Sequence, residues 1–187
     1  MNNPERKEFK FKPGQFVYDT TGAEPARQIL IIREQYLDWD LSALHTDNPK
    51  VKNMYVVREY GRSLDCEGPG SAMHYNECNL RLWTLDDITP GEIYSKKISD
   101  DNILAGIVRS YDKTTGVVTM AVYAETRSPT AVVDEDKSFR ADELLPASVY
   151  DKIMLLEKMN SSNIEYNQKT MTVMIVKSKG KSNKNKH

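Results

Sequence analysis

Cysteine and histidine are scarce in this sequence of 187 residues, which contains two cysteines, Cys66 and Cys78, and three histidines. Two cysteines exclude a disulfide-rich scaffold and are usual in proteins of a reducing compartment. The sequence also lacks a run of about 20 apolar residues, the length that a membrane-spanning helix requires. Because its first residues contain no apolar signal segment, we expect a cytoplasmic protein that does not contact a membrane.

Neither sign of charge dominates, since 26 Lys and Arg residues stand against 27 Asp and Glu residues. The exception is segment 177–187, which contains five lysines and no acidic residue. The whole chain has a net charge of −1, and the chain without this segment has a net charge of −6. Such a segment attracts phosphate or acidic surfaces without sequence selectivity. We expect a disordered tail that is either simply solvated or contacts nucleic acid through Lys177, Lys179, Lys181, Lys184 and Lys186.

Short apolar segments separated by turn residues dominate the rest of the chain. Gly, Pro, Asn and Asp interrupt these segments repeatedly, which favours many short strands. The four consecutive apolar residues Ile29–Ile32 predict a strand that is buried on both faces. We expect strands within residues 13–22, 26–37, 54–60, 79–85, 91–94, 103–111, 117–124, 164–166 and 171–176.

One segment has the periodicity of an amphipathic helix, and it follows Pro146. We predict a helix over residues 147–159, with a hairpin after it. Its apolar face is expected to consist of Val149, Ile153, Leu156 and Asn160, widened by Leu155 and Met159.

Two segments repeat a pattern of Pro-Gly, one polar residue and an apolar stretch that ends in Tyr. They are residues 12–18 and 89–94, and they suggest two small β units in succession. We therefore expect a mainly β protein of the α+β class, with an SH3-like, partly open barrel first. The expected parts are a charged arm (1–12), the SH3-like barrel (13–88), a second small β unit (89–140), a helix with a β-hairpin (141–176) and the lysine-rich tail (177–187).

Three segments of the sequence resemble those of a set of uncharacterised β-rich proteins from gut anaerobic bacteria and their phages. The segments are Phe11–Val17, Leu82–Ile93, which contains Trp-Thr-Leu-Asp-Asp and Pro-Gly-Glu, and Leu145–Met159 with the hairpin that follows. Gln15 and Glu92 replace an Asp that is common in that set. The resemblance implies the order of parts and a phage or mobile-element origin, with a bacterial or phage-host cytoplasm as the location, but it implies no activity.

Aromatic residues are concentrated in the first β unit. SH3-like and related barrels use exposed aromatic side chains to bind peptides or unstacked bases, whereas buried ones only pack the core. Trp83 has the same two interpretations, as an anchor between the β units or as a platform for a ligand, and its apolar surroundings favour the anchor. The candidate partner-binding residues are Tyr18, Tyr36, Trp39, Tyr55 and Tyr60.

Cys66, His74 and Cys78 lie within 13 residues and have the side chains of a zinc site or of a cysteine nucleophile. Their spacing differs from the paired cysteines of structural zinc sites, and no fourth ligand is evident. Nothing in the sequence indicates an activated thiol. A loop with an inert thiol is the simpler interpretation.

These observations leave three hypotheses. The leading one is a non-enzymatic protein-binding or assembly protein, related to phages or mobile elements, that needs no cofactor and binds a protein partner. The second is a nucleic-acid-binding accessory protein that uses the lysine-rich tail. The third is a small zinc or thiol enzyme at Cys66, His74 and Cys78. The sequence leaves the oligomeric state open.

Overall fold

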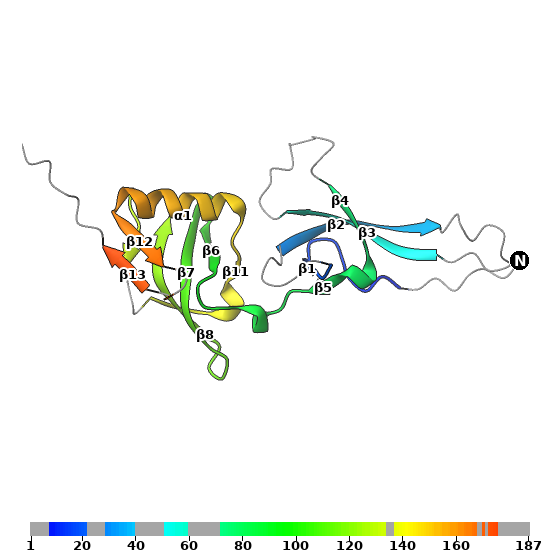
Figure 1. Ribbon diagram of the computed structural model, residues 1–187, viewed down its shortest axis with the longest axis horizontal. Helices are drawn as coiled ribbons and strands as arrows, with labels where there is room; N and C mark the ends of the chain where they lie inside the picture. Colours follow the sequence, from blue (N-terminus) through cyan, green and yellow to red (C-terminus); the bar gives the residue numbers. More distant parts are fainter. Residues whose placement is uncertain are drawn as a thin grey trace, which may run out of the picture. The chain divides into compact units, whose positions relative to one another are not determined.

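The computed structural model describes residues 8–21, 29–39, 51–59, 72–133, 137–167, 170 and 172–175. The chain divides into two compact units, residues 1–87 and 88–187. The mainly β, α+β class predicted from the sequence is confirmed, because antiparallel strands make up most of the described residues of each unit and an α-helix lies near the C-terminus (Figure 1). Among the described residues, no helix is both long enough and apolar enough to cross a membrane.

The first unit contains a five-stranded antiparallel sheet with the order β4-β3-β2-β1-β5. A short 3-10 helix, η2 (Glu77–Asn79), lies between β4 and β5, and another, η3 (Leu85–Asp87), follows β5. The strands are β1 (Phe16–Asp19), β2 (Ile29–Trp39), β3 (Val51–Glu59), β4 (Met73–Asn76) and β5 (Leu80–Leu82).

The second unit contains a six-stranded sheet with the order β10-β8-β7-β6-β11, in which β9 also pairs with β8. The 3-10 helix η4 (Ala141–Glu143) lies between β10 and β11, and the helix α1 (Val149–Ser161) follows. The strands are β6 (Ile93–Ser99), β7 (Asn102–Asp112), β8 (Val117–Glu125), β9 (Val132–Val133), β10 (Ser138–Arg140) and β11 (Leu145–Pro146). A separate hairpin of β12 (Ile164–Asn167) and β13 (Thr172–Ile175) completes the unit.

The two units repeat one strand order. In each, three consecutive antiparallel strands are followed by an edge strand, a 3-10 helix and a last strand that pairs with the first. The strand order of the first unit is thus repeated in the second, which has the additional strand β9. Neither sheet closes into a barrel in the described part of the chain, because β4 and β5, and likewise β10 and β11, are left as edges.

The repeated Pro-Gly pattern forms the same turn in both units. Gly14 and Gly91 have φ angles of 86° and 89°, a region that L-amino acids with a Cβ avoid. The Gly14 N–H donates to the Ile32 carbonyl at 2.8 Å, and the Gly91 N–H donates to the Val108 carbonyl at 2.8 Å. The next strands also share a register, since Phe16 pairs with Ile31 and Ile93 with Ile107. The sequence repeat is therefore a structural repeat.

The first unit has a single described core, to which the N-terminal arm contributes Phe11 and Phe9. In β2 the side chains of Leu30 and Ile32 are buried, whereas Ile29 and Ile31 are partly exposed. The prediction of a strand buried on both faces is therefore wrong, because β2 alternates as strands with one covered face do. The core consists of Phe11, Val17, Leu30, Ile32, Tyr55, Val57 and Leu80.

The second unit buries residues on both faces of its sheet. One face of β7 and β8 packs against α1 and the hairpin. Leu104, Val108 and Met120 of the same two strands are also buried, but they do not belong to the cluster that contacts α1. This sheet continues to Pro146, beyond the boundary at residue 140 expected from the sequence, and α1 belongs to the same unit. β4, β9, β10, β11 and the 3-10 helices were not predicted, because segments of two to four residues carry no periodicity.

Candidate binding surface on helix α1

The start of α1 is set by local hydrogen bonds. The Asp151 N–H donates to Ser148 Oγ at 3.1 Å, and the Ser148 N–H donates to Asp151 Oδ2 at 3.1 Å. This reciprocal capping box satisfies two N–H groups that the first turn of a helix leaves without an internal acceptor. Pro146 and Ala147 before it are buried, so the helix begins at a fixed point on the second unit.

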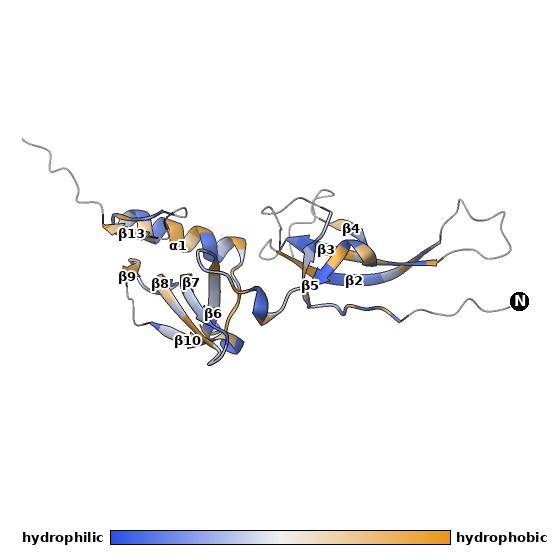
Figure 2. Cartoon of the chain, turned by 60° about the horizontal axis from the view of Figure 1, so that its bottom comes forward, coloured by the Kyte–Doolittle hydropathy of each residue, from blue (hydrophilic) through white to orange (hydrophobic). Residues whose placement is uncertain are grey.

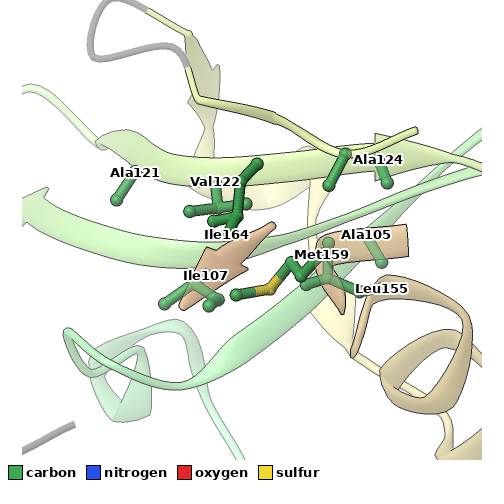
Figure 3. Packing of buried hydrophobic residues seen from close by; sticks show 9 residues of the cluster. Ala105, Ile107, Ala121, Val122, Ala124, Leu155, Met159 and Ile164 are labelled. Atoms are coloured by element: carbon green, nitrogen blue, oxygen red, sulfur yellow. The ribbon is translucent and has the colours of Figure 1, made fainter. Parts of the chain in front are cut away.

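The inward face of α1 packs on the sheet through Asp151, Leu155 and Met159, which are all buried. Figure 3 shows Leu155 and Met159 beside Ala105 and Ile107 of β7, with Ile164 of the hairpin close by. The sheet contributes three small side chains to this cluster, Ala105, Ala121 and Ala124, along with Ile107 and Val122. Small residues let a helix approach a sheet closely.

Lys158 connects the last turns of α1 by hydrogen bonds to the end of β8 and the loop that follows it. Its ammonium group donates to the carbonyl oxygens of Glu125, Thr126 and Ser128, with the Thr126 contact at 2.8 Å. The Ala131 N–H also donates to Ser162 Oγ at 3.0 Å, just beyond the end of the helix. With the buried inward face, these bonds fix how α1 is rotated about its axis.

The outward stripe of α1 consists of Val149, Ile153, Leu156 and Asn160, the residues that the sequence analysis placed on the buried apolar face. Ile153 is 48% exposed and Leu156 is 53% exposed, Asn160 is also exposed, and Val149 is partly buried. That prediction is wrong about the direction of the face, although Leu155 and Met159 are buried as expected. Tyr150, which is 58% exposed, lies beside the stripe.

A groove of about 370 Å³ borders the outward stripe. Leu156, Met159 and Asn160 line it from the helix, and Ile164, Glu165 and Tyr166 line it from β12. Burial raises the pKa of the Tyr166 hydroxyl, against the opposing effect of the positive charge of Arg109. Tyr166 is therefore one of the polar side chains of the groove, with Asn160 and Glu165, and stripe and groove form a continuous surface.

Of the aromatic residues predicted to bind a partner, the structure describes the side chains of Tyr18, Tyr36 and Tyr55. Tyr18 and Tyr55 are buried in the first unit, so neither is presented on a surface as the prediction requires. Tyr36 is partly exposed, with its hydroxyl 2.9 Å from His74 Nδ1 on the neighbouring part of the sheet. The Trp39 side chain and Tyr60 lie outside the described residues.

The Tyr55 hydroxyl belongs to a polar network that holds the N-terminal arm. It donates to Glu77 Oε2 at 2.6 Å and accepts from the Phe11 N–H at 3.2 Å. Asn53 Nδ2 and the Lys10 N–H also donate to Glu77 Oε2, both at 3.0 Å. Burial alone would raise the pKa of Glu77, but these hydrogen bonds outweigh it and lower the pKa below its ordinary value.

The same contacts act on Tyr55 in the opposite direction. Burial and the hydrogen bond to Glu77 raise the pKa of the Tyr55 hydroxyl to about 12. Both groups are therefore held in their neutral-pH forms, a phenol donating to a carboxylate. The sequence analysis missed this network because its members are 22 and 44 residues apart in the chain.

Trp83 packs within the first unit against Phe16, with ring centroids 6.2 Å apart and an edge-to-face geometry. Beside it, Arg81 forms a two-pronged ion pair with Asp87 at 2.8 and 3.1 Å, and the Thr84 N–H donates to the same carboxylate. Burial would raise the pKa of Asp87, but the hydrogen bonds from Arg81 and Thr84 lower it. These contacts fold the segment that ends the unit.

The proposed metal or thiol residues are only partly described. Cys66 lies outside the described residues, His74 is on β4 beside Tyr36, and Cys78 is exposed in η2 with Sγ 3.4 Å from Asn79 Oδ1. Within the described ranges, no three His, Cys, Asp or Glu side chains are grouped as a metal site requires. The five lysines of the predicted tail lie outside the described residues.

Comparisons with known proteins do not identify the chain, since no family model and no curated protein matches it. The resemblance to proteins of gut anaerobic bacteria and their phages stays a prediction.

Proposed function

We propose that the chain is a non-enzymatic protein-binding or assembly protein, and that it binds its partner through the outward stripe of α1 and the adjoining groove. The observation that carries the proposal is the exposure of Ile153 and Leu156 on a helix that already buries Leu155 and Met159 on its other side. A helix needs only one apolar face to pack on its own domain. The second face supports a partner helix or strand, since clustered exposed apolar side chains mark interaction surfaces.

Rigidity supports the proposal as well. The capping box at Ser148 and the three carbonyl contacts of Lys158 hold α1 near both of its ends. A surface held in one conformation loses little conformational entropy when a partner docks. The outward stripe is therefore ready to bind without rearrangement of the helix.

The test is affinity capture by the full-length chain from bacterial lysate, with and without nuclease treatment, and the wild type is compared to Ile153→Lys. We expect the lysine variant to lose its discrete protein partner, because an ammonium group would have to be buried at the centre of the contact. The matched control is Ile98→Lys on β6, where an isoleucine is 47% exposed in the same unit. The control should capture like the wild type.

Two results would overturn the proposal. One is equal capture by wild type, Ile153→Lys and Ile98→Lys. The other is capture that disappears with nuclease treatment or with deletion of residues 177–187, which would favour the nucleic-acid hypothesis instead.

A further inference from the structure

The spacing of the outward stripe is that of a heptad seam. Its residues follow one another at intervals of four, three and four, which is the alternation of a and d positions in helices that pair side by side. Ile153 and Asn160 occupy a positions, and Val149 and Leu156 occupy d positions. Figure 2 shows hydrophobic and hydrophilic stretches alternating along α1.

Most of the remaining heptad positions agree with the packing of α1 on its own sheet, although Met159, which is buried on that sheet, occupies a g position. Asp151 and Lys158 occupy f positions, Met154 a b position and Leu155 a c position, and all four are buried or partly buried on the inward side. In a helix pair the b, c and f positions point away from the partner helix. The helix can therefore pack on its sheet and on a partner at the same time.

Charge placement selects the partner and its direction. Lys152 occupies a g position and Glu157 the following e position, and both side chains are exposed. In a parallel pair, a g residue lies beside the e residue five positions later in the other helix. Two copies of α1 would thus form the Lys152–Glu157 contact twice, once on each side of the seam. Within the described residues, neither side chain forms an ion pair.

We propose that the partner of the outward stripe is a second copy of this chain, bound by parallel, two-fold symmetric pairing of α1 with α1. This inference rests on the proposed function and names its partner. A β-branched residue at a with leucine at d, as in Ile153 and Leu156, favours two parallel helices. Asn160 at the next a position meets its own copy across the two-fold axis, which fixes the register.

The pairing is weak because α1 has 13 residues and offers only four seam positions. Interfaces of this size fall at the small end of specific contacts, and we expect a dissociation constant on the order of micromolar to hundreds of micromolar. The dimer therefore forms and dissociates within an accessible range of protein concentration.

Sedimentation equilibrium of the full-length chain, at low salt and over a range of concentrations, tests the pairing. We expect a reversible monomer–dimer equilibrium whose dissociation constant rises about tenfold in Lys152→Glu and in Glu157→Lys, because each change places like charges together at two symmetric contacts. The double variant, with the two charges exchanged, should recover the wild-type constant. That recovery separates a lost contact from a misfolded helix.

The homodimers of the single variants distinguish parallel from antiparallel pairing. In an antiparallel pair residue 152 would meet residue 152 and residue 157 would meet residue 157, so each single change would leave two like-charge contacts and the dissociation constant would not rise. A mixture of Lys152→Glu and Glu157→Lys tests the charge contacts themselves, because only the heterodimer places opposite charges together, and native mass spectrometry should show more heterodimer than either homodimer. Equal dissociation constants for wild type and single variants, or a statistical mixture of dimers, would overturn the parallel pairing.

A chain that stays monomeric at every concentration would overturn the proposal that the partner is a second copy. The capture experiment would then test the proposed function separately. If Ile153→Lys still loses a captured protein, the stripe binds another partner and the proposed function stands. If it loses none, both proposals fail.

Discussion

Glu77 is the residue that connects the N-terminal arm to the first sheet, since Tyr55, Asn53 and the Lys10 N–H all donate to its Oε2 atom. Its pKa is lowered in the folded chain. A carboxyl group with a lowered folded pKa contributes stability above its unfolded pKa, about 4.5, and loses that contribution as the pH falls through the folded value. Glu77→Gln should therefore flatten the loss of stability of the first unit below about pH 4.5.

Tryptophan fluorescence follows this unit selectively, because both tryptophans, Trp39 and Trp83, belong to it. Urea unfolding at several pH values gives the free energy of unfolding of wild type and variant. At neutral pH the variant should be less stable by about 1–3 kcal/mol, because the amide cannot accept three hydrogen bonds as the carboxylate does. Unchanged stability and an unchanged acid slope would contradict the role assigned to Glu77, and Glu165→Gln in the second unit serves as the control.

Tyrosines illustrate what sequence alone can decide at this scale. The enrichment of the first unit in aromatic residues is visible in the sequence, but whether a tyrosine faces a partner or the core is not. Tyr55 is buried because Phe11 and Glu77, both distant in sequence, supply a donor and an acceptor for its hydroxyl. The sequence contains no local signal for partners of that kind.

Among the elements, the Pro-Gly turns offer a matched pair of predictions. Gly14→Ala and Gly91→Ala should each destabilise their own unit by about 1–2 kcal/mol, because both positions have positive φ angles that a Cβ disfavours. A Cβ at Gly14 would contact nothing within 4 Å, so the effect there is one of backbone conformation alone.

Amide hydrogen exchange measures this effect at the bonds beside each turn, Ile32 N–H to Gln15 O and Val108 N–H to Glu92 O. Protection should fall at Ile32 in the first variant and at Val108 in the second. Gly14→Asn should lose less than Gly14→Ala, because asparagine tolerates positive φ better. Equal protection of these amides in the wild type and in both alanine variants would contradict the claim that the two glycine turns stabilise their units.

For helix α1, the periodicity of the sequence predicts where the helix lies but not which of its faces is buried. Its position was predicted to within two residues, because helical spacing and the preceding proline are local signals. The direction of its faces was not, because α1 carries apolar residues on two sides. The alanines of β7 and β8, which admit Leu155 and Met159, decide the direction, and they are distant in sequence.

At the scale of the whole molecule, the chain consists of two units with one strand order, and the second unit has gained a helix and a hairpin. The Pro-Gly repeat predicted two β units from the sequence alone. The extent of the second sheet could not be read in the same way, because β11, which completes it, is two residues long. The added helix gives the second unit a surface that the described part of the first unit lacks.

The central claim is that this surface, the outward stripe of α1, is where the chain binds protein. Methyl NMR spectra of the full-length chain with labelled isoleucines, recorded over a dilution series, test it most directly. The account predicts that the Ile153 signal shifts with concentration while that of Ile98, equally exposed on β6, stays fixed. An Ile153 signal that is constant on dilution, and unmoved by any protein that the chain captures, would contradict it.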